Sequence, residues 1–107
     1  MGIADKNRFE SREVRCAYAV FSGIASRPED ADRQSASREA RNRLADETDE
    51  TVEALAAICR EDGAEARLFG ALGLAANRRE ALLEALTADP FATGRRLNRA
   101  RAASLAR

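Results

Sequence analysis

The amino-acid sequence predicts an all-α protein, a small bundle of about four to six helices. Strong helix formers (Ala, Leu, Arg and Glu) dominate the chain, and Pro28 and Pro90 are its only prolines. Apolar residues recur at the helical spacing i, i+3, i+4, i+7, whereas the alternation typical of strands is missing. The 107 residues are expected to form a single helical domain, 1–107, in which 94–107 is either a flexible or a docked basic tail.

The apolar residues available for a core are small. Alanine accounts for 24 residues, whereas Leu, Ile, Val and Phe together account for 20. A chain of this length buries somewhat less than about 70% of its unfolded surface, and alanine adds little apolar area to it. We therefore expect a thin core that gains stability from a partner or a second copy.

The first helix is expected from about Phe9 or Ser11 to Ile24. One face carries apolar residues at helical spacing, namely Val14, Ala17, Tyr18, Phe21, Ile24 and Ala25. Tyr18 is expected to pack on this face with its hydroxyl bonded to a polar partner.

A second helix is expected to begin at Pro28, with Ser26 as its N-cap, because the fixed φ of proline suits a first helical position. Its apolar stripe is thin and consists of Ala36, Ala40 and Leu44. Such a helix either packs closely through its alanines, orders on binding a partner or is largely solvated.

A third apolar stripe follows an acidic run at 46–53 and consists of Val52, Leu55, Ala56 and Cys59, with Ile58 beside it. Thr48 or Asp49 could cap this helix, but nothing between Leu44 and Val52 forbids a helix. Residues 28–62 are therefore predicted as either one helix or two. The stripe is expected to end near Gly63, before a short glycine-containing helix at 64–75.

The last helices have the clearest start signals. Asn77 and Glu80 form an Asn-x-x-Glu start, which predicts a helix from about Arg78 to Thr87. Asp89 followed by Pro90 then reads as an N-cap and a first helical residue.

Composition excludes most catalytic chemistry. The chain has no histidine, which removes Ser-His and Cys-His nucleophiles and histidine metal ligands. Glycine-rich phosphate loops, GxSxG elbows and EF-hand spacing are also missing. We therefore expect no enzyme, no cofactor and no metal site. Cys16 and Cys59 are expected to be buried thiols.

No apolar stretch approaches the roughly 18 residues of a membrane span, and no secretion signal is evident at Met1. A soluble, cytoplasmic protein without membrane contact is expected. A helix-turn-helix with Gly63 in its turn is a poor match, because Asp62 occupies a position that should be apolar.

Charge is distributed unevenly although the formal net charge is zero. The segment 94–107 holds five arginines and no acid, and its candidate nucleic-acid contacts are Arg95, Arg96, Arg99 and Arg101. The acidic run either stabilises a helix start or attracts a basic partner. Its candidate partner-binding residues are Asp46, Glu47, Asp49 and Glu50.

These features favour a small non-catalytic protein that binds another protein, or itself, to modulate a larger assembly as an adaptor, regulator or inhibitor. Accessory proteins of bacteria or phages offer an analogy in size and composition. The alternative is a nucleic-acid-binding or nucleic-acid-associated regulator that uses the arginine-rich C-terminal segment.

Overall fold

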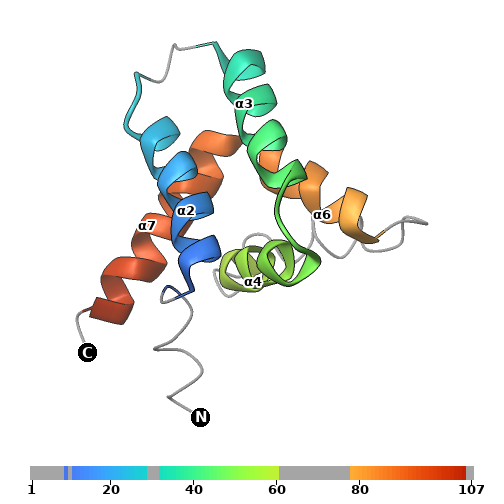
Figure 1. The fold of residues 1–107 in the computed structure, drawn as a ribbon. Coiled ribbons are helices and arrows are strands. Elements are labelled where there is room, and N and C mark those ends of the chain that lie inside the picture. The colour runs from blue at the N-terminus through green and yellow to red at the C-terminus, as the bar shows by residue number, and fades with distance from the viewer. Residues whose placement is uncertain (1–8, 10, 29–31, 61–77, 106–107) are drawn as a thin grey trace.

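The computed structural model describes residues 9, 11–28, 32–60 and 78–105, and these form five α-helices (Figure 1). The helices are α2 (Arg12–Ala25), α3 (Arg33–Ala45), α4 (Asp49–Arg60), α6 (Arg78–Thr87) and α7 (Pro90–Leu105). No β-strand occurs in the described part of the chain. The prediction of a small all-α bundle is confirmed.

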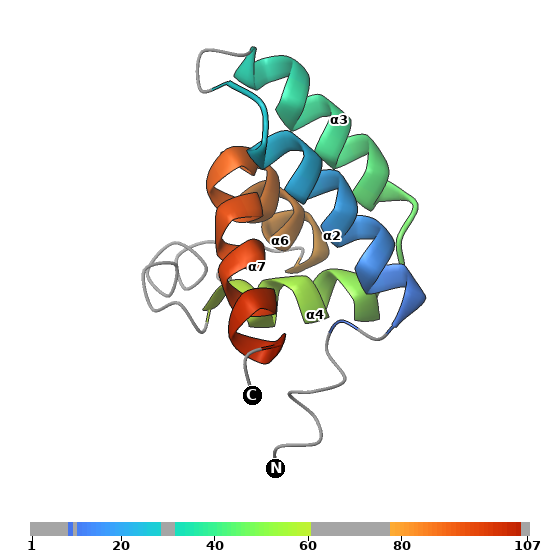
Figure 2. The ribbon, with the colours of Figure 1, turned by 90° about the vertical axis from the view of Figure 1, so that its left-hand side faces the viewer.

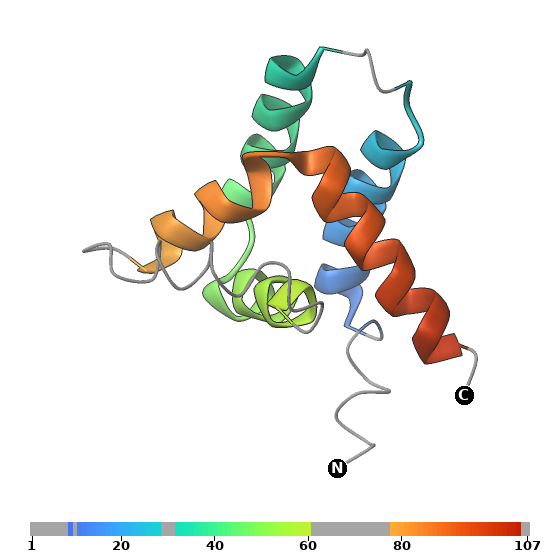
Figure 3. The same cartoon turned by 180° about the vertical axis from the view of Figure 1, so that it is seen from behind.

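Helices α2 and α7 run antiparallel, side by side, and make the most extensive helix–helix contact of the fold (Figure 1). Helix α3 packs against α2 and α6, and α4 crosses one end of the other helices (Figure 2). Seen from behind, α6 leads directly into α7 through a sharp bend (Figure 3). The N-terminal ends of α2 and α4 lie close to each other, because residues of both line one hollow.

Helix α2 follows the sequence prediction closely. Ser11 is its N-cap and accepts a hydrogen bond from the backbone N–H of Val14. The predicted apolar face is directed inward, with Val14, Ala17, Phe21 and Ile24 buried. Tyr18 is half-buried and donates its hydroxyl proton to Asn98 Oδ1 of α7 at 2.6 Å, which confirms the predicted polar partner.

The predicted start of α3 is wrong. Pro28 lies outside the helix, and α3 begins at Arg33 with Asp32 as its N-cap. The Asp32 carboxylate accepts hydrogen bonds from the backbone N–H groups of residues 34 and 35. Ser26 instead ends α2, because its N–H and its hydroxyl both donate to carbonyls of the last turn of that helix. Because α3 begins at Arg33, Asp32 directly precedes its first turn and caps it, whereas Ser26 lies beside the end of α2.

Helices α3 and α4 are separate, which decides between the two predicted alternatives for this region. The chain leaves α3 at Asp46, and Thr48 starts α4 by accepting a hydrogen bond from the N–H of Thr51 at 3.2 Å. The buried residues of α3 are Ala36, Ala40 and Leu44. Close packing through alanines therefore holds for this helix.

Helices α6 and α7 begin where the sequence predicts. Asp89 caps α7 by accepting from the N–H of Ala92, and Pro90 is the first helical residue. The segment 94–105 continues α7 without a break and packs through Leu97 into the core. Two buried hydroxyls, of Thr87 and Thr93, donate to carbonyl groups of α6.

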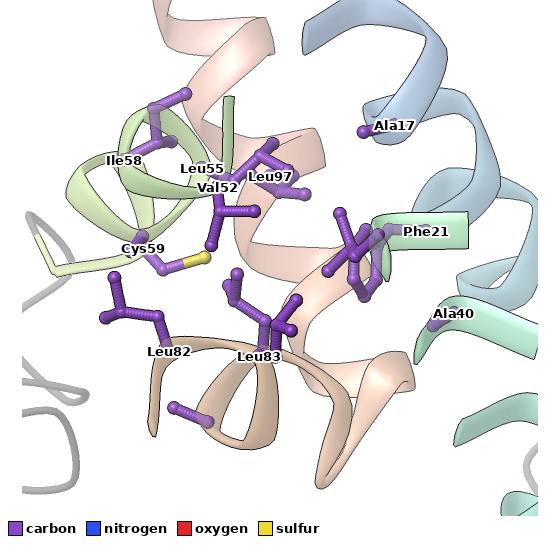
Figure 4. Close-up of a cluster of buried hydrophobic side chains, with 14 of the residues drawn as sticks. Ala17, Phe21, Ala40, Val52, Leu55, Ile58, Cys59, Leu82, Leu83 and Leu97 are labelled. Atoms are coloured by element: carbon purple, nitrogen blue, oxygen red, sulfur yellow. The ribbon is translucent and has the colours of Figure 1, made fainter. Parts of the chain in front are cut away.

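The core combines residues from all five helices (Figure 4). Its largest fully buried side chains are Phe21, Ile24, Leu44, Leu55, Leu82, Leu86, Leu97, Val52, Pro90 and Cys59. Cys59 is buried as predicted, whereas Cys16 is half-buried, and the two are not joined by a disulfide. In the described part of the chain, Leu105 is the only large apolar side chain that is exposed.

Three sequence predictions fall at 61–77 and so lie outside the described residues. They are the end of the third helix near Gly63, the helix at 64–75 and the start signal at Asn77. Within the described residues, no helix is both long and apolar enough to cross a bilayer.

Candidate binding surfaces

A hollow of about 450 Å³ lies where the N-terminal ends of α2 and α4 meet. Its lining, which we call the α2–α4 cleft, consists of Ser11, Glu13, Val14, Thr48, Glu50, Thr51 and Ala54. Two carboxylates, three hydroxyls and two apolar side chains thus surround one space. A volume of this order is large enough to hold part of a ligand or of a partner protein.

The hydroxyls of the cleft are engaged at the helix ends. Ser11 donates to the Glu13 carboxylate at 2.8 Å and accepts from a backbone N–H, while the Thr48 and Thr51 hydroxyls lie 3.1 Å apart. Glu50 is exposed and makes no ion pair with any described residue. The two carboxylates are therefore the groups best placed to meet an incoming ligand.

The surroundings of Glu13 favour its ionised carboxylate. A hydrogen bond from its own backbone N–H lowers the pKa of Glu13, and the Ser11 hydroxyl lowers it further. Glu13 therefore carries its negative charge at neutral pH and keeps it to a lower pH than an ordinary glutamate does.

The four predicted acidic residues do not form one surface. Glu50 alone among them lines the cleft. Asp46 is exposed at the C-terminal end of α3. Glu47 forms an ion pair with Arg43 at 3.3 Å, and Asp49 forms one with Arg79 at 2.6 Å.

Arg79 of α6 holds the corner between α3 and α4. Its guanidinium donates to the carbonyl oxygens of Leu44, Ala45 and Glu47 at 2.8–3.3 Å, and to the Asp49 carboxylate. Carbonyls at a helix C-terminus have no partner within the helix, so a cation there satisfies them and complements the helix dipole. The acidic run is therefore partly a structural feature.

Two further ion pairs tie α6 to its neighbours. Arg78 binds the Glu53 carboxylate of α4 through two nitrogens, one of them at 2.9 Å from Oε1, and this pairing raises the pKa of the arginine. Arg41 of α3 binds Glu80. Both pairs are largely exposed, so each contributes little to stability.

The predicted arginine cluster of α7 is divided by the helix geometry. Arg95 and Arg99 are exposed and lie one turn apart, so they point away from the core. Arg96 is half-buried at the side of the helix. The four arginines therefore do not share one face.

Arg101 takes part in an aromatic cluster instead. Its guanidinium lies 5.7 Å from the centroid of the Phe9 ring and 5.6 Å from that of Tyr18. The two rings meet edge to face with centroids 5.5 Å apart. This cation–π contact fixes Phe9 and Arg101 against α2, where Arg101 contributes to packing.

Sequence reasoning missed Glu13 as a site residue. Its place in the first turn of α2 explains it as a helix-start acid, and nothing local connects it to Glu50 of α4. Among the described residues, no group of three or more His, Cys, Asp or Glu side chains is arranged to hold a metal ion.

No protein-family model, curated protein or solved structure matches this chain. Any assignment of function therefore depends on the surfaces described above.

Proposed function

We propose that this protein is a non-catalytic helical protein that binds another protein to modulate a larger assembly, and that the α2–α4 cleft receives a basic segment of that partner. The observation that supports this proposal is the convergence of Glu13 and Glu50 on one hollow. Opposite charge in a partner would complement these two carboxylates.

The lining of the cleft suits a long basic side chain in particular. Arginine and lysine carry a hydrocarbon stem below a charged head, and such stems pack along apolar surface. Val14 and Ala54 offer that surface, and the carboxylates of Glu13 and Glu50 offer acceptors for the head group. Hydrogen bonds from a cation to a carboxylate are about twice as strong as neutral ones.

Support for partner binding thus comes from the charged groups of the cleft and not from an apolar face. The thin core suggested an apolar docking face, but Leu105 is the only large exposed apolar residue among those described. A contact dominated by charged groups is weakened by salt and depends on electrostatic steering. We therefore expect a salt-sensitive interaction.

Titration calorimetry with a short peptide of alternating Arg and Ala tests the proposal. The double variant Glu13→Gln, Glu50→Gln is expected to bind this peptide at least tenfold more weakly than the wild type, since tenfold corresponds to about 1.4 kcal/mol. Glu84→Gln is the matched control, because Glu84 is an exposed acid of α6 outside the cleft. This control is expected to bind like the wild type.

At low salt, the wild-type protein should bind the peptide better than a second peptide in which Glu replaces every Arg. Equal binding of the two peptides would refute the cleft as a binding site. Equal losses in the cleft variant and in Glu84→Gln would show that binding depends on overall charge and not on the cleft.

A further inference from the structure

The side of α3 that is turned away from the core carries three polar side chains in one row. Gln34, Arg38 and Asn42 follow one another at a spacing of four residues, and all three are exposed. Each stands two positions before one of the three buried residues of α3, and positions two apart lie on nearly opposite sides of a helix. We call this row the α3 polar face. No residue of α3 lines the α2–α4 cleft.

Helix α3 is shallowly embedded in the bundle. It lies along one edge, packed against α2 and α6 (Figure 2). A stripe of two alanines and one leucine is all that it buries, so most of its circumference is exposed. The major groove of B-DNA is about 12 Å wide and admits an α-helix. The exposed side of α3 therefore has the shape that insertion into this groove requires.

The charge of α3 complements a nucleic acid. The helix contains four arginines and one glutamate. That glutamate, Glu39, is bound by Arg27 of the preceding segment at 2.7 Å, so its charge is compensated. Arg33 and Arg38 are exposed and form no ion pair with any described residue. The outer side of the helix thus presents positive charge to a polyanion.

We propose that the α3 polar face enters the major groove of double-stranded DNA and contacts the edges of the bases. An arginine pairs with O6 and N7 of guanine through two hydrogen bonds, and the amide of asparagine or glutamine pairs with N6 and N7 of adenine in the same way. Residues four apart are separated by a rise of about 6 Å, close to two base-pair steps of about 3.4 Å. The site expected for Arg38 is a guanine, with adenines for Gln34 and Asn42 about two base pairs to either side.

The side-chain chemistry of the face favours DNA over other polyanions. Among the described helices, α3 alone carries exposed carboxamides, since Asn98 of α7 is half-buried and accepts the hydroxyl proton of Tyr18. An acidic protein surface is complemented by cations, whereas two of the three groups on this face are neutral amides. The major groove of an RNA duplex is too deep and narrow for side chains to read. Base edges of DNA match all three groups.

Selection from a pool of DNA duplexes with a randomised central segment, using the full-length protein at low salt, tests this proposal. Sequencing of the bound duplexes should show enrichment of a guanine with adenines within about two base pairs. Fluorescence anisotropy with an enriched duplex then measures affinity. Arg38→Ala should weaken binding at least about fivefold, the lower limit for loss of a bidentate contact to a base.

Arg15→Ala is the matched control, because Arg15 is an exposed arginine of α2 away from the α3 polar face. It should bind the enriched duplex like the wild type. Gln34→Ala and Asn42→Ala should each remove the preference for one adenine and leave the preference for guanine in place. All four positions are exposed, so wild-type circular dichroism is expected for every variant and is checked first.

Absence of sequence enrichment by the wild type overturns the proposal, as does an equal loss of affinity in Arg38→Ala and Arg15→Ala. Equal affinity for an RNA duplex of the enriched sequence also overturns it, because base edges in the major groove would then not be read. Binding of an acidic peptide but not of DNA, lost in Arg38→Ala, overturns it and assigns the face to a protein partner.

Discussion

The contact between α2 and α7 depends on a glycine. A Cβ atom added at Gly94 would lie 2.3 Å from the backbone oxygen of Phe21 and 2.7 Å from the Cβ of Ala25. Ordinary contacts of a Cβ atom begin at 3.4 Å, so the first distance is about 1 Å too short. The Phe21 oxygen belongs to helix backbone and cannot rotate away. Gly94→Ala should therefore push the two helices apart.

The expected magnitude follows from two opposing effects. Alanine in place of glycine inside a helix gains about 1 kcal/mol from backbone entropy. Overpacking of a tight contact costs about 1–3 kcal/mol, and a clash with backbone at the largest helix contact belongs at the upper end. We expect Gly94→Ala to lower the free energy of unfolding by about 2 kcal/mol and the midpoint of thermal unfolding by roughly 10 °C.

Gly23 provides the matched control within the partner helix. It is exposed on α2, and a Cβ atom there would meet nothing within 4 Å. Gly23→Ala should therefore raise the free energy of unfolding by about 0.5–1 kcal/mol. Urea denaturation followed by far-UV circular dichroism measures both variants on the same scale.

The opposite signs of the two changes are the decisive result. If Gly94→Ala is as stable as Gly23→Ala, the helices do not approach as closely as the structure shows, and the reasoning is refuted. A second variant keeps the test informative if Gly94→Ala alone does not fold. Ala25→Gly removes one of the two clashing atoms, so its effect combined with Gly94→Ala should be less destabilising than the sum of the single effects.

Three other predictions concern polar contacts. Arg79→Ala should lower the free energy of unfolding, measured in urea, by about 1.5–3 kcal/mol because it leaves the carbonyls at the end of α3 unsatisfied. Arg41→Ala, which removes only the exposed ion pair with Glu80, should change this free energy by less than about 1 kcal/mol. Tyr18→Phe should lower it by about 0.5–1.5 kcal/mol through loss of the hydroxyl hydrogen bond to α7; an unchanged urea midpoint would contradict that contact. Because the pKa of Glu13 is lowered in the folded protein, its charge contributes to stability above pH 4.5, and this contribution is lost as the pH falls through the pKa of the folded state. Thermal melts should therefore show a smaller loss of stability in acid for Glu13→Gln than for the wild type.

Several elements were predictable because their signals are local. The apolar spacing of α2 and the Asp89-Pro90 start of α7 both concern residues within a few positions of one another. The start of α4 stayed open in the sequence, between Thr48 and Asp49 as the cap and between one helix and two, and the structure decided it. The start of α3 was not predictable in the same way, because Ser26 and Asp32 are both good caps. In the structure Ser26 ends α2, and Asp32 is the N-cap of α3.

The candidate site was less predictable than the fold. From the sequence, the acidic run and the C-terminal arginines were each predicted as one cluster. In the structure, Asp49 is paired with Arg79, and Arg101 lies over two aromatic rings. Each predicted cluster is therefore divided between side chains held in contacts within the fold and side chains that are exposed.

By itself, the sequence determined that the chain forms helices and which face of α2 and α4 is buried, since helical periodicity and end caps are interactions between near neighbours. Only the tertiary structure decided which charges lie together. Glu13 and Glu50 line one hollow because α4 crosses the end of α2, and Arg79 reaches carbonyls more than thirty residues away because α6 packs beside α3. Such pairings depend on the relative placement of helices, which a long-range core fixes and a local pattern does not encode.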